Sequence, residues 1–229
     1  MNMAVQQHVT IPQVKICGIT RPADALAAAT AGADAIGLNF YAGPRRINLT
    51  QAKAVLDALN RQIPVVALID GSATGEYSAA NLHVALGVRL FQVYLAGGGM
   101  AATNLAISAK FWLVSHVAKP LDLAALRQRI GAVGFPVAAV LLDTFVPGQS
   151  GGTGAAFNWH WIAAARAAGE LADLPPIILA GGLNADNVAA AIAIAQPAWV
   201  DVSGGVESGT AGIKDPRRIA DFIAAVRRA

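Results

Sequence analysis

Residues 137–143 read VAAVLLD, six apolar residues followed by an aspartate. An apolar run this short and this continuous is typical of a strand buried on both faces, as in the parallel sheets of α/β proteins. Runs of the same kind recur along the rest of the chain. We therefore predict seven further strands, at residues 14–17, 35–40, 65–70, 90–94, 111–117, 177–180 and 199–203.

Longer, alanine-rich amphipathic stretches separate these runs and are predicted to be helices. They cover residues 22–31, 50–60, 75–86, 101–110, 121–133, 157–168, 185–193 and 215–228. Strict alternation of strands and helices indicates an α/β protein with a parallel sheet, and eight such units close into a single (β/α)8 TIM barrel with an eight-stranded core. We expect this domain over residues 13–229, after a flexible N-terminal extension over residues 1–12. An open, doubly wound sheet is the alternative.

The composition of the 229 residues disfavours several classes of protein. Hydrophobic residues make up 55% and charged residues 14%, so the chain has ample apolar surface to bury and is not expected to be disordered. Its apolar runs fall short of the roughly 20 residues of a membrane helix, and we expect neither a signal peptide nor a membrane partner. The formal net charge is only +3, and no nucleic-acid partner is expected. The densest basic cluster is interpreted as a solvated helix face and consists of Arg217, Arg218, Arg227 and Arg228.

Cys17 is the single cysteine, which excludes an intrachain disulfide and a thiolate zinc cluster and favours a reducing, cytoplasmic location. In TIM barrels the active site lies at the carboxyl ends of the strands, and both Cys17 and Asp143 end predicted strands. Acid–base catalysis needs two groups in different protonation states, so these two residues are a candidate pair across the barrel mouth. The structural alternatives are a core cysteine and a loop-capping aspartate.

Glycine-rich turns follow the last two predicted strands. Gly181 and Gly182 follow the seventh strand, and Ser203, Gly204 and Gly205 follow the eighth. Such turns allow backbone N–H groups to approach a phosphate closely, and barrels often bind phosphate at these two loops. We therefore predict a small phosphorylated substrate there, with tight turns alone as the alternative.

Two further loops carry candidate binding residues. Residues 151–154, which include Gly152, follow the sixth predicted strand and form either a loop that closes over a substrate or a plain connection. Arg45 follows Pro44 in the loop after the second strand, where a guanidinium can pair with a carboxylate. The neighbouring Arg46 competes for this role, and a solvated arginine is the alternative for both.

Asp201 and Ser203 share one face of the eighth predicted strand, because they are two residues apart. Either both line the site, or Asp201 is a structural ion-pair partner of Lys15. By the same alternation, Lys15 shares a face with Cys17 on the first strand.

Taken together, these motifs resemble those of the phosphoribosylanthranilate isomerases. The motifs are KICGIT at 15–20, GLNFY at 37–41 with PR at 44–45, LLDT at 141–144, GGTG at 151–154 with Phe157 and Trp159, AGGLN at 180–184, VDVS at 200–203 with GVE at 205–207, and GIKD at 212–215. They occur in the family's order from about residue 14 to the C-terminus. The combination is highly specific, although each piece alone is not.

The resemblance implies an isomerase of tryptophan biosynthesis that converts N-(5-phosphoribosyl)anthranilate into 1-(2-carboxyphenylamino)-1-deoxyribulose 5-phosphate by an Amadori rearrangement. It implies that Asp143 protonates the furanose ring oxygen, that Cys17 removes the C2 proton, and that Arg45 holds the anthranilate carboxylate. It implies neither a metal nor an organic cofactor. The oligomeric state, monomer or homodimer, is left open.

The first half of the chain departs from the family pattern. After the fourth strand the family usually reads Gln-Leu-His-Gly, whereas residues 92–95 here read QVYL. The loop before Pro44 is about one residue shorter, and Gly204 replaces a second serine. Two alternatives therefore stand beside the isomerase: a divergent relative acting on another phosphorylated sugar, and a non-catalytic barrel that binds a phosphorylated metabolite. The presence of both Cys17 and Asp143 argues against the second.

Overall fold

The computed structural model describes residues 11–95, 108–144 and 156–229. Within them, eight parallel strands close into a barrel in chain order, and β8 pairs with β1 to complete the ring. The strands are β1 (Gln13–Ile16), β2 (Ala35–Asn39), β3 (Val65–Asp70), β4 (Leu90–Tyr94), β5 (Lys110–Val117), β6 (Val137–Thr144), β7 (Ile177–Leu179) and β8 (Trp199–Val202). The closed barrel is confirmed, and the open sheet is wrong.

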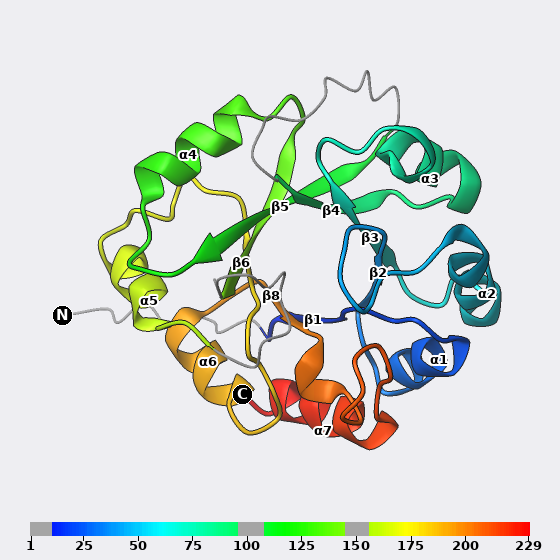
Figure 1. The fold of residues 1–229 in the computed structure, drawn as a ribbon. Helices are drawn as coiled ribbons and strands as arrows, with labels where there is room; N and C mark the ends of the chain where they lie inside the picture. The colour runs from blue at the N-terminus through cyan, green and yellow to red at the C-terminus, as the bar shows by residue number, and fades with distance from the viewer. Residues whose placement is uncertain (1–10, 96–107, 145–155) are drawn as a thin grey trace.

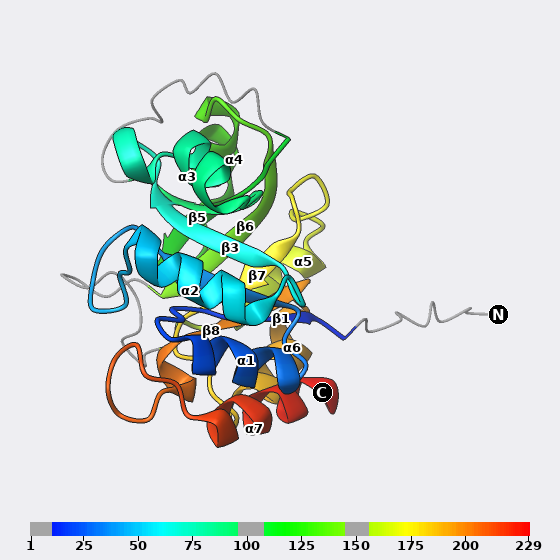
Figure 2. The same ribbon diagram turned by 90° about the vertical axis from the view of Figure 1, so that its right-hand side faces the viewer.

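Helices surround the ring of strands (Figure 1), and a side view shows α1 and α2 lying against its outer face (Figure 2). The described residues form α1 (Pro22–Thr30), α2 (Leu49–Leu59), η1 (Gly75–Tyr77), α3 (Ala79–Leu86), α4 (Leu123–Ala132), α5 (His160–Ala167), α6 (Val188–Ala195), η2 (Gly204–Val206) and α7 (Pro216–Arg227), where η1 and η2 are short 3-10 helices. The helix expected at 101–110 lies mostly outside the described residues, and Lys110 belongs to β5. The expected extension at 1–12 also lies almost entirely outside them and stays a prediction.

Two of the helices that begin later than the periodicity predicts do so because polar side chains bond to the backbone before them. Ser78 accepts a hydrogen bond from the Asn81 N–H and caps α3, which separates α3 from η1. Asn184 accepts from the N–H groups of Asp186 and Asn187 at 2.9 and 3.1 Å, which forms a turn ahead of α6. Such local side-chain bonds compete with helix formation.

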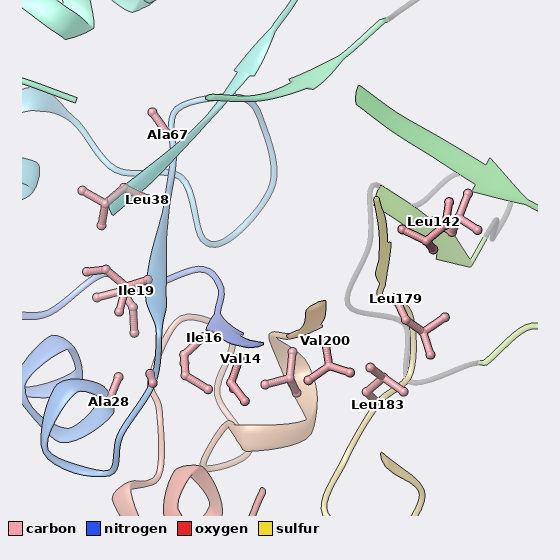
Figure 3. Close-up of a cluster of buried hydrophobic side chains, with 14 of the residues drawn as sticks. Val14, Ile16, Ile19, Ala28, Leu38, Ala67, Leu142, Leu179, Leu183 and Val200 are labelled. Atoms are coloured by element: carbon pink, nitrogen blue, oxygen red, sulfur yellow. The ribbon is translucent and has the colours of Figure 1, made fainter. Parts of the chain in front are cut away.

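The strands are buried on both faces, which accounts for their continuous apolar runs. On β1, Val14 and Ile16 point outward into a large cluster between strands and helices, part of which Figure 3 shows. Lys15 and Cys17 alternate with them and point inward, where Lys15 contacts Asp201 of β8. The continuous apolar pattern therefore contains two separate layers.

The barrel interior is a packed core rather than a pore. One of its apolar residues is Trp112, which packs against Trp199 with the ring centroids 5.2 Å apart. The other members are Cys17, Ala35, Val66, Leu68, Tyr94, Val114, Ala139, Leu141, Ile178 and Ala180. No helix in the described part of the chain combines the length and the apolar character needed to span a bilayer.

Arg227, near the end of α7, ties the last helix to the beginning of the barrel. Its guanidinium donates to the carbonyl oxygens of Pro12 and Gly32 at 3.2 and 3.1 Å and to Asp34 Oδ2 at 2.7 Å. The same Asp34 oxygen accepts from the Val14 N–H at 2.7 Å. One side chain therefore holds β1, the α1–β2 connection and α7 together.

Replacing Arg227 with alanine should lower the free energy of unfolding by about 1–2 kcal/mol. The effect is modest because the side chains of Arg227 and Asp34 are partly exposed to water. Arg228→Ala is the matched control, because Arg228 is exposed and makes no side-chain hydrogen bond within the described residues. Urea denaturation of the three proteins measures the difference. Equal destabilisation by both substitutions would contradict this role for Arg227.

Candidate active site

A cavity of about 330 Å³ opens at the carboxyl ends of β6, β7 and β8. It brings together most of the residues that the sequence singled out. The lining residues are Asp143, Ala180, Gly181, Gly182, Leu183, Asn184, Asp201, Val202, Ser203, Gly204, Gly205, Glu207, Gly209 and Arg218. Gly152 lies outside the described residues, so its predicted position over the substrate stays a prediction.

Glycine is required where the loops around this cavity meet. Gly181 has a φ of +85°, and a Cβ there would collide with the Thr144 backbone and lie 2.9 Å from Asp143 Oδ1. A Cβ at Gly205 would collide with the carbonyl oxygen of Leu183. The loops after β7 and β8 therefore pack backbone against backbone beside the cavity.

Asp143 lies near the end of β6, is 8% exposed, and lines the cavity. Its Oδ1 accepts a hydrogen bond of 2.8 Å from the Thr144 N–H. Burial, followed by the charge of Asp201, raises the pKa of Asp143 from 3.8 to about 6, while Thr144 and Lys15 oppose the shift. A carboxyl group with this pKa can serve as a proton donor near neutral pH.

Cys17 follows β1 and is 6% exposed. Its side chain packs in the barrel interior beside Gly37, where an added Cβ would lie 2.9 Å from Sγ. It is not among the residues that line the 330 Å³ cavity, so the expectation that Cys17 and Asp143 project into one pocket is not met for Cys17. Asp201 is nonetheless close enough to both to raise both pKa values.

A thiolate base needs surroundings that favour the ionised thiol, but those of Cys17 favour the protonated thiol. Burial raises the pKa of the Cys17 thiol above 9, and the carboxylate of Asp201 raises it further. Lys15 and Lys214 lower the pKa, but they offset only part of the shift. The thiol is therefore protonated in the unliganded protein.

A buried polar network lies within the barrel, beside Cys17. Lys15, which has no exposed surface, donates to Asp201 Oδ1 at 2.7 Å and to Gln92 Oε1 at 2.9 Å. Gln92 in turn donates from Nε2 to the Tyr94 hydroxyl at 2.9 Å. Asp201 thus fills both roles left open by the sequence, because it pairs with Lys15 and lines the cavity.

Tyr94 stands where the family usually has a histidine. Its ring stacks in parallel on Tyr41, from the loop after β2, with the two centroids 4.6 Å apart. Burial raises its pKa well above 10, and the negative charges of Cys17, Asp143 and Asp201 would raise it further. The phenol is therefore a neutral group in the interior of the mouth.

Arg45 is not the free guanidinium that the sequence suggested. It donates from Nε and Nη2 to the two carboxylate oxygens of Glu207 at 2.7 and 2.8 Å. Glu207 also accepts from the Gly212 N–H at 2.8 Å and from Lys214 Nζ at 3.0 Å. Burial alone would raise the pKa of Glu207, but Arg45 and Lys214 lower it to about 2. Arg46, the competing arginine, lies over the ring of Tyr77 at 5.1 Å.

Glu207 and Lys214 are the site residues that the residue-by-residue reasoning missed. Both lie in segments quoted for the family resemblance, GVE and GIKD, but neither was given a role. Lys214 has almost no exposed surface and also donates to the carbonyl and hydroxyl oxygens of Ser203. Their presence inside the family motifs was the available signal. Within the described residues, no group of histidine, cysteine or acidic side chains has the arrangement of a metal site.

Comparison with known proteins identifies the family. A family model described as N-(5'-phosphoribosyl)anthranilate (PRA) isomerase matches residues 14–225. The chain belongs to the PRA isomerase family. A PRA isomerase of Pseudomonas fluorescens is 44% identical over 216 residues, which cover 93% of this chain and 95% of the relative.

Solved structures of PRA isomerases share the fold. A structure of monomers of the dimeric enzyme from Thermotoga maritima superposes with a TM-score of 0.74 at 25% identity, over 95% of this chain and 100% of the other. A PRA isomerase in complex with reduced 1-(o-carboxyphenylamino)-1-deoxyribulose 5-phosphate gives a TM-score of 0.72 at 25% identity, with the same coverage.

The raised pKa of Asp143 predicts a pH-dependent stability. A carboxyl group whose pKa is higher in the folded protein stabilises the fold below pH 4, and this stabilisation is lost as the pH rises through about 6. Asp143→Asn removes the buried charge, so the variant should exceed the wild type in stability at pH 7.5, by on the order of 3 kcal/mol, and by much less at pH 4.

Thermal and urea unfolding at the two pH values measure this difference. Asp186→Asn, in the exposed loop after β7, is the matched control and should change stability little at either pH. An Asp143→Asn advantage that is equal at pH 4 and pH 7.5 would show that the buried charge is not its cause.

Proposed function

We propose that this chain converts N-(5-phosphoribosyl)anthranilate into 1-(2-carboxyphenylamino)-1-deoxyribulose 5-phosphate, with Asp143 as the acid and Cys17 as the base. The observation that carries the proposal is the position of Asp143, a carboxyl group with a pKa of about 6 beside the glycine loops after β7 and β8. Membership of the PRA isomerase family supports it. The reaction belongs to tryptophan biosynthesis, and we place it in the cytoplasm.

The rearrangement begins with ring opening. Asp143 donates its proton to the furanose oxygen, the bond between that oxygen and C1 breaks, and the anthranilate nitrogen becomes an iminium. The iminium acidifies the neighbouring C2–H bond, so that Cys17 can remove the proton as a thiolate and leave an enolamine. The enolamine then takes up a proton at C1 and loses the proton of its C2 hydroxyl, which gives the ketone. Cys17 releases a proton and Asp143 regains one, so that no net proton is consumed. Two positioned groups therefore suffice.

The predominant ionisation of the two groups is the opposite of the one that the reaction requires. A pKa of about 6 leaves Asp143 mostly ionised at pH 7, and the raised pKa of Cys17 keeps its thiol protonated. The reacting form, with a protonated Asp143 and a Cys17 thiolate, holds the same total number of protons. It is therefore a constant minor fraction of the protein between the two pKa values, since the sites titrate as a pair.

The phosphate of the substrate fits the loops after β7 and β8. Gly181 and Gly205 bring the two loop backbones together at the cavity, and Ser203 and Gly204 complete the second loop. Backbone N–H groups in such loops can donate hydrogen bonds directly to phosphate oxygens. A relative whose structure holds a reduced phosphorylated product belongs to the same family.

Arg45 remains the candidate for the anthranilate carboxylate, despite its ion pair. Its Nε and Nη2 groups bind Glu207 through one edge of the guanidinium. A guanidinium carries five N–H donors, so the edge formed by Nη1 and the second Nη2 hydrogen can bind another carboxylate bidentately. Glu207 thus orients Arg45 without occupying all of its donors.

Turnover of N-(5-phosphoribosyl)anthranilate by the purified protein tests the proposal, and also separates it from action on another phosphorylated sugar. Cys17→Ala and Asp143→Asn should each lower kcat by on the order of 100-fold or more, the usual contribution of a positioned acid or base. Affinity for a product analogue should change much less, because phosphate and carboxylate contacts lie elsewhere. Near-normal turnover in either folded variant would remove that residue from the mechanism.

Arg45→Ala should raise KM for N-(5-phosphoribosyl)anthranilate by about tenfold or more, the effect of losing one charge-assisted pair. Binding of ribose 5-phosphate, which has no carboxylate, should be unchanged within about twofold. Arg46→Ala is the control and should leave both values near those of the wild type. If Arg46→Ala raised KM and Arg45→Ala did not, the assignment of the carboxylate to Arg45 would be wrong.

The Thermotoga maritima relative is described as dimeric. For this chain we infer a monomer or a homodimer that binds a small phosphorylated substrate.

A further inference from the structure

The charges around the cavity are unevenly compensated. Its lining includes three carboxylates, Asp143, Asp201 and Glu207, and a single cation within the described residues, Arg218. Asp201 pairs with Lys15 at 2.7 Å, and Glu207 pairs with both Arg45 and Lys214. The remaining carboxylate, Asp143, is mostly ionised at pH 7 and forms no salt bridge within the described residues.

Arg218 differs from these groups because it has no close counter-ion. Its Nε lies 4.0 Å from Asp215 Oδ2, beyond hydrogen-bonding distance, and its side chain is 57% exposed. One donor, Nη1, bonds to the carbonyl oxygen of Glu207 at 2.7 Å, immediately after η2. This bond holds the guanidinium against the loop that follows β8, while its other N–H groups have no acceptor among the described residues.

We propose that Arg218 is the counter-ion of the substrate phosphate. This inference rests on the proposed function for the identity of the substrate, but not for the binding of phosphate. A phosphate monoester brings a charge of roughly −1.5 to −2 near neutral pH, which backbone N–H groups alone do not neutralise. Among the described residues no other cationic side chain lines the cavity, and residues 96–107 and 145–155 contain neither lysine nor arginine. The buried Lys15, Lys214 and the partly buried Arg45 are already paired.

Direct titration of the full-length protein with inorganic phosphate, by calorimetry, tests this role without requiring turnover. Arg218→Gln removes the charge but keeps an N–H group that can donate to the Glu207 carbonyl oxygen. A loss of affinity is then caused by the missing charge and not by the loss of that hydrogen bond. The Arg218→Gln substitution should weaken phosphate binding by about tenfold, a modest factor because the Arg218 side chain is partly exposed to water. Arg218→Lys should retain most of the affinity.

Arg217→Gln is the matched control, because Arg217 is the adjacent exposed residue on α7 and its backbone N–H is capped by Asp215 in the same way. It should bind phosphate like the wild type. Raising the salt concentration should weaken phosphate binding to the wild type more than to Arg218→Gln, since screening acts on the charge. Wild-type affinity in folded Arg218→Gln, or an equal loss in Arg217→Gln, would overturn the proposal.

Turnover then separates this inference from the proposed function. KM for N-(5-phosphoribosyl)anthranilate should rise about tenfold in Arg218→Gln while kcat changes by less than about threefold, because the phosphate does not react. A wild-type protein that binds phosphate through Arg218 but does not turn over this substrate would contradict the proposed function alone. Normal turnover with an unchanged KM in Arg218→Gln would contradict only the role of Arg218 as the counter-ion of the phosphate.

Discussion

The ion pair between Lys15 and Asp201 lies inside the barrel, where an unpaired charge would be strongly destabilising. It joins β1 to β8, the two strands that close the ring, in the same register as their backbone pairing. The rest of the mouth depends on it, because Lys15 also holds Gln92, and Gln92 holds Tyr94. Asp201 in turn raises the pKa values of Cys17 and Asp143. One buried pair thus serves the fold and the chemistry.

The same pairing determines which charges are available to a substrate. The carboxylates of Asp201 and Glu207 are neutralised by partners from elsewhere in the barrel, whereas Asp143 is mostly ionised at pH 7 and forms no salt bridge within the described residues. An anionic substrate therefore meets a mouth with three carboxylates, two of which are compensated by buried cations. The buried, ionised carboxyl group of Asp143 is also unfavourable for stability, which is a common cost of a functional site. The protein tolerates this because the strands around the mouth are packed on both faces.

Strand positions could be predicted from the sequence, since continuous apolar runs arise from burial on both faces, and the strand ends located Asp143 and the glycine loops correctly. The ion pair of Arg45 with Glu207 could not be predicted, because it joins residues 162 positions apart through loop geometry that no periodicity encodes. The inward packing of Cys17 depends on the space left by Gly37 on a neighbouring strand. The starts of the helices after Ser78 and Asn184 were not predicted, because in each case the hydrogen bonds of one side chain determine where the helix begins.

The proposed roles of Asp143 and Cys17 as acid and base depend on ionisation states that burial fixes. The most direct test is kcat/KM for N-(5-phosphoribosyl)anthranilate as a function of pH, corrected for the ionisation of the substrate phosphate measured by phosphorus NMR. Because the acid has the lower pKa of the pair, kcat/KM should rise as the pH passes through about 6 and then stay level until the pH reaches the raised pKa of Cys17. A kcat/KM that falls as the pH rises through 6 would contradict it.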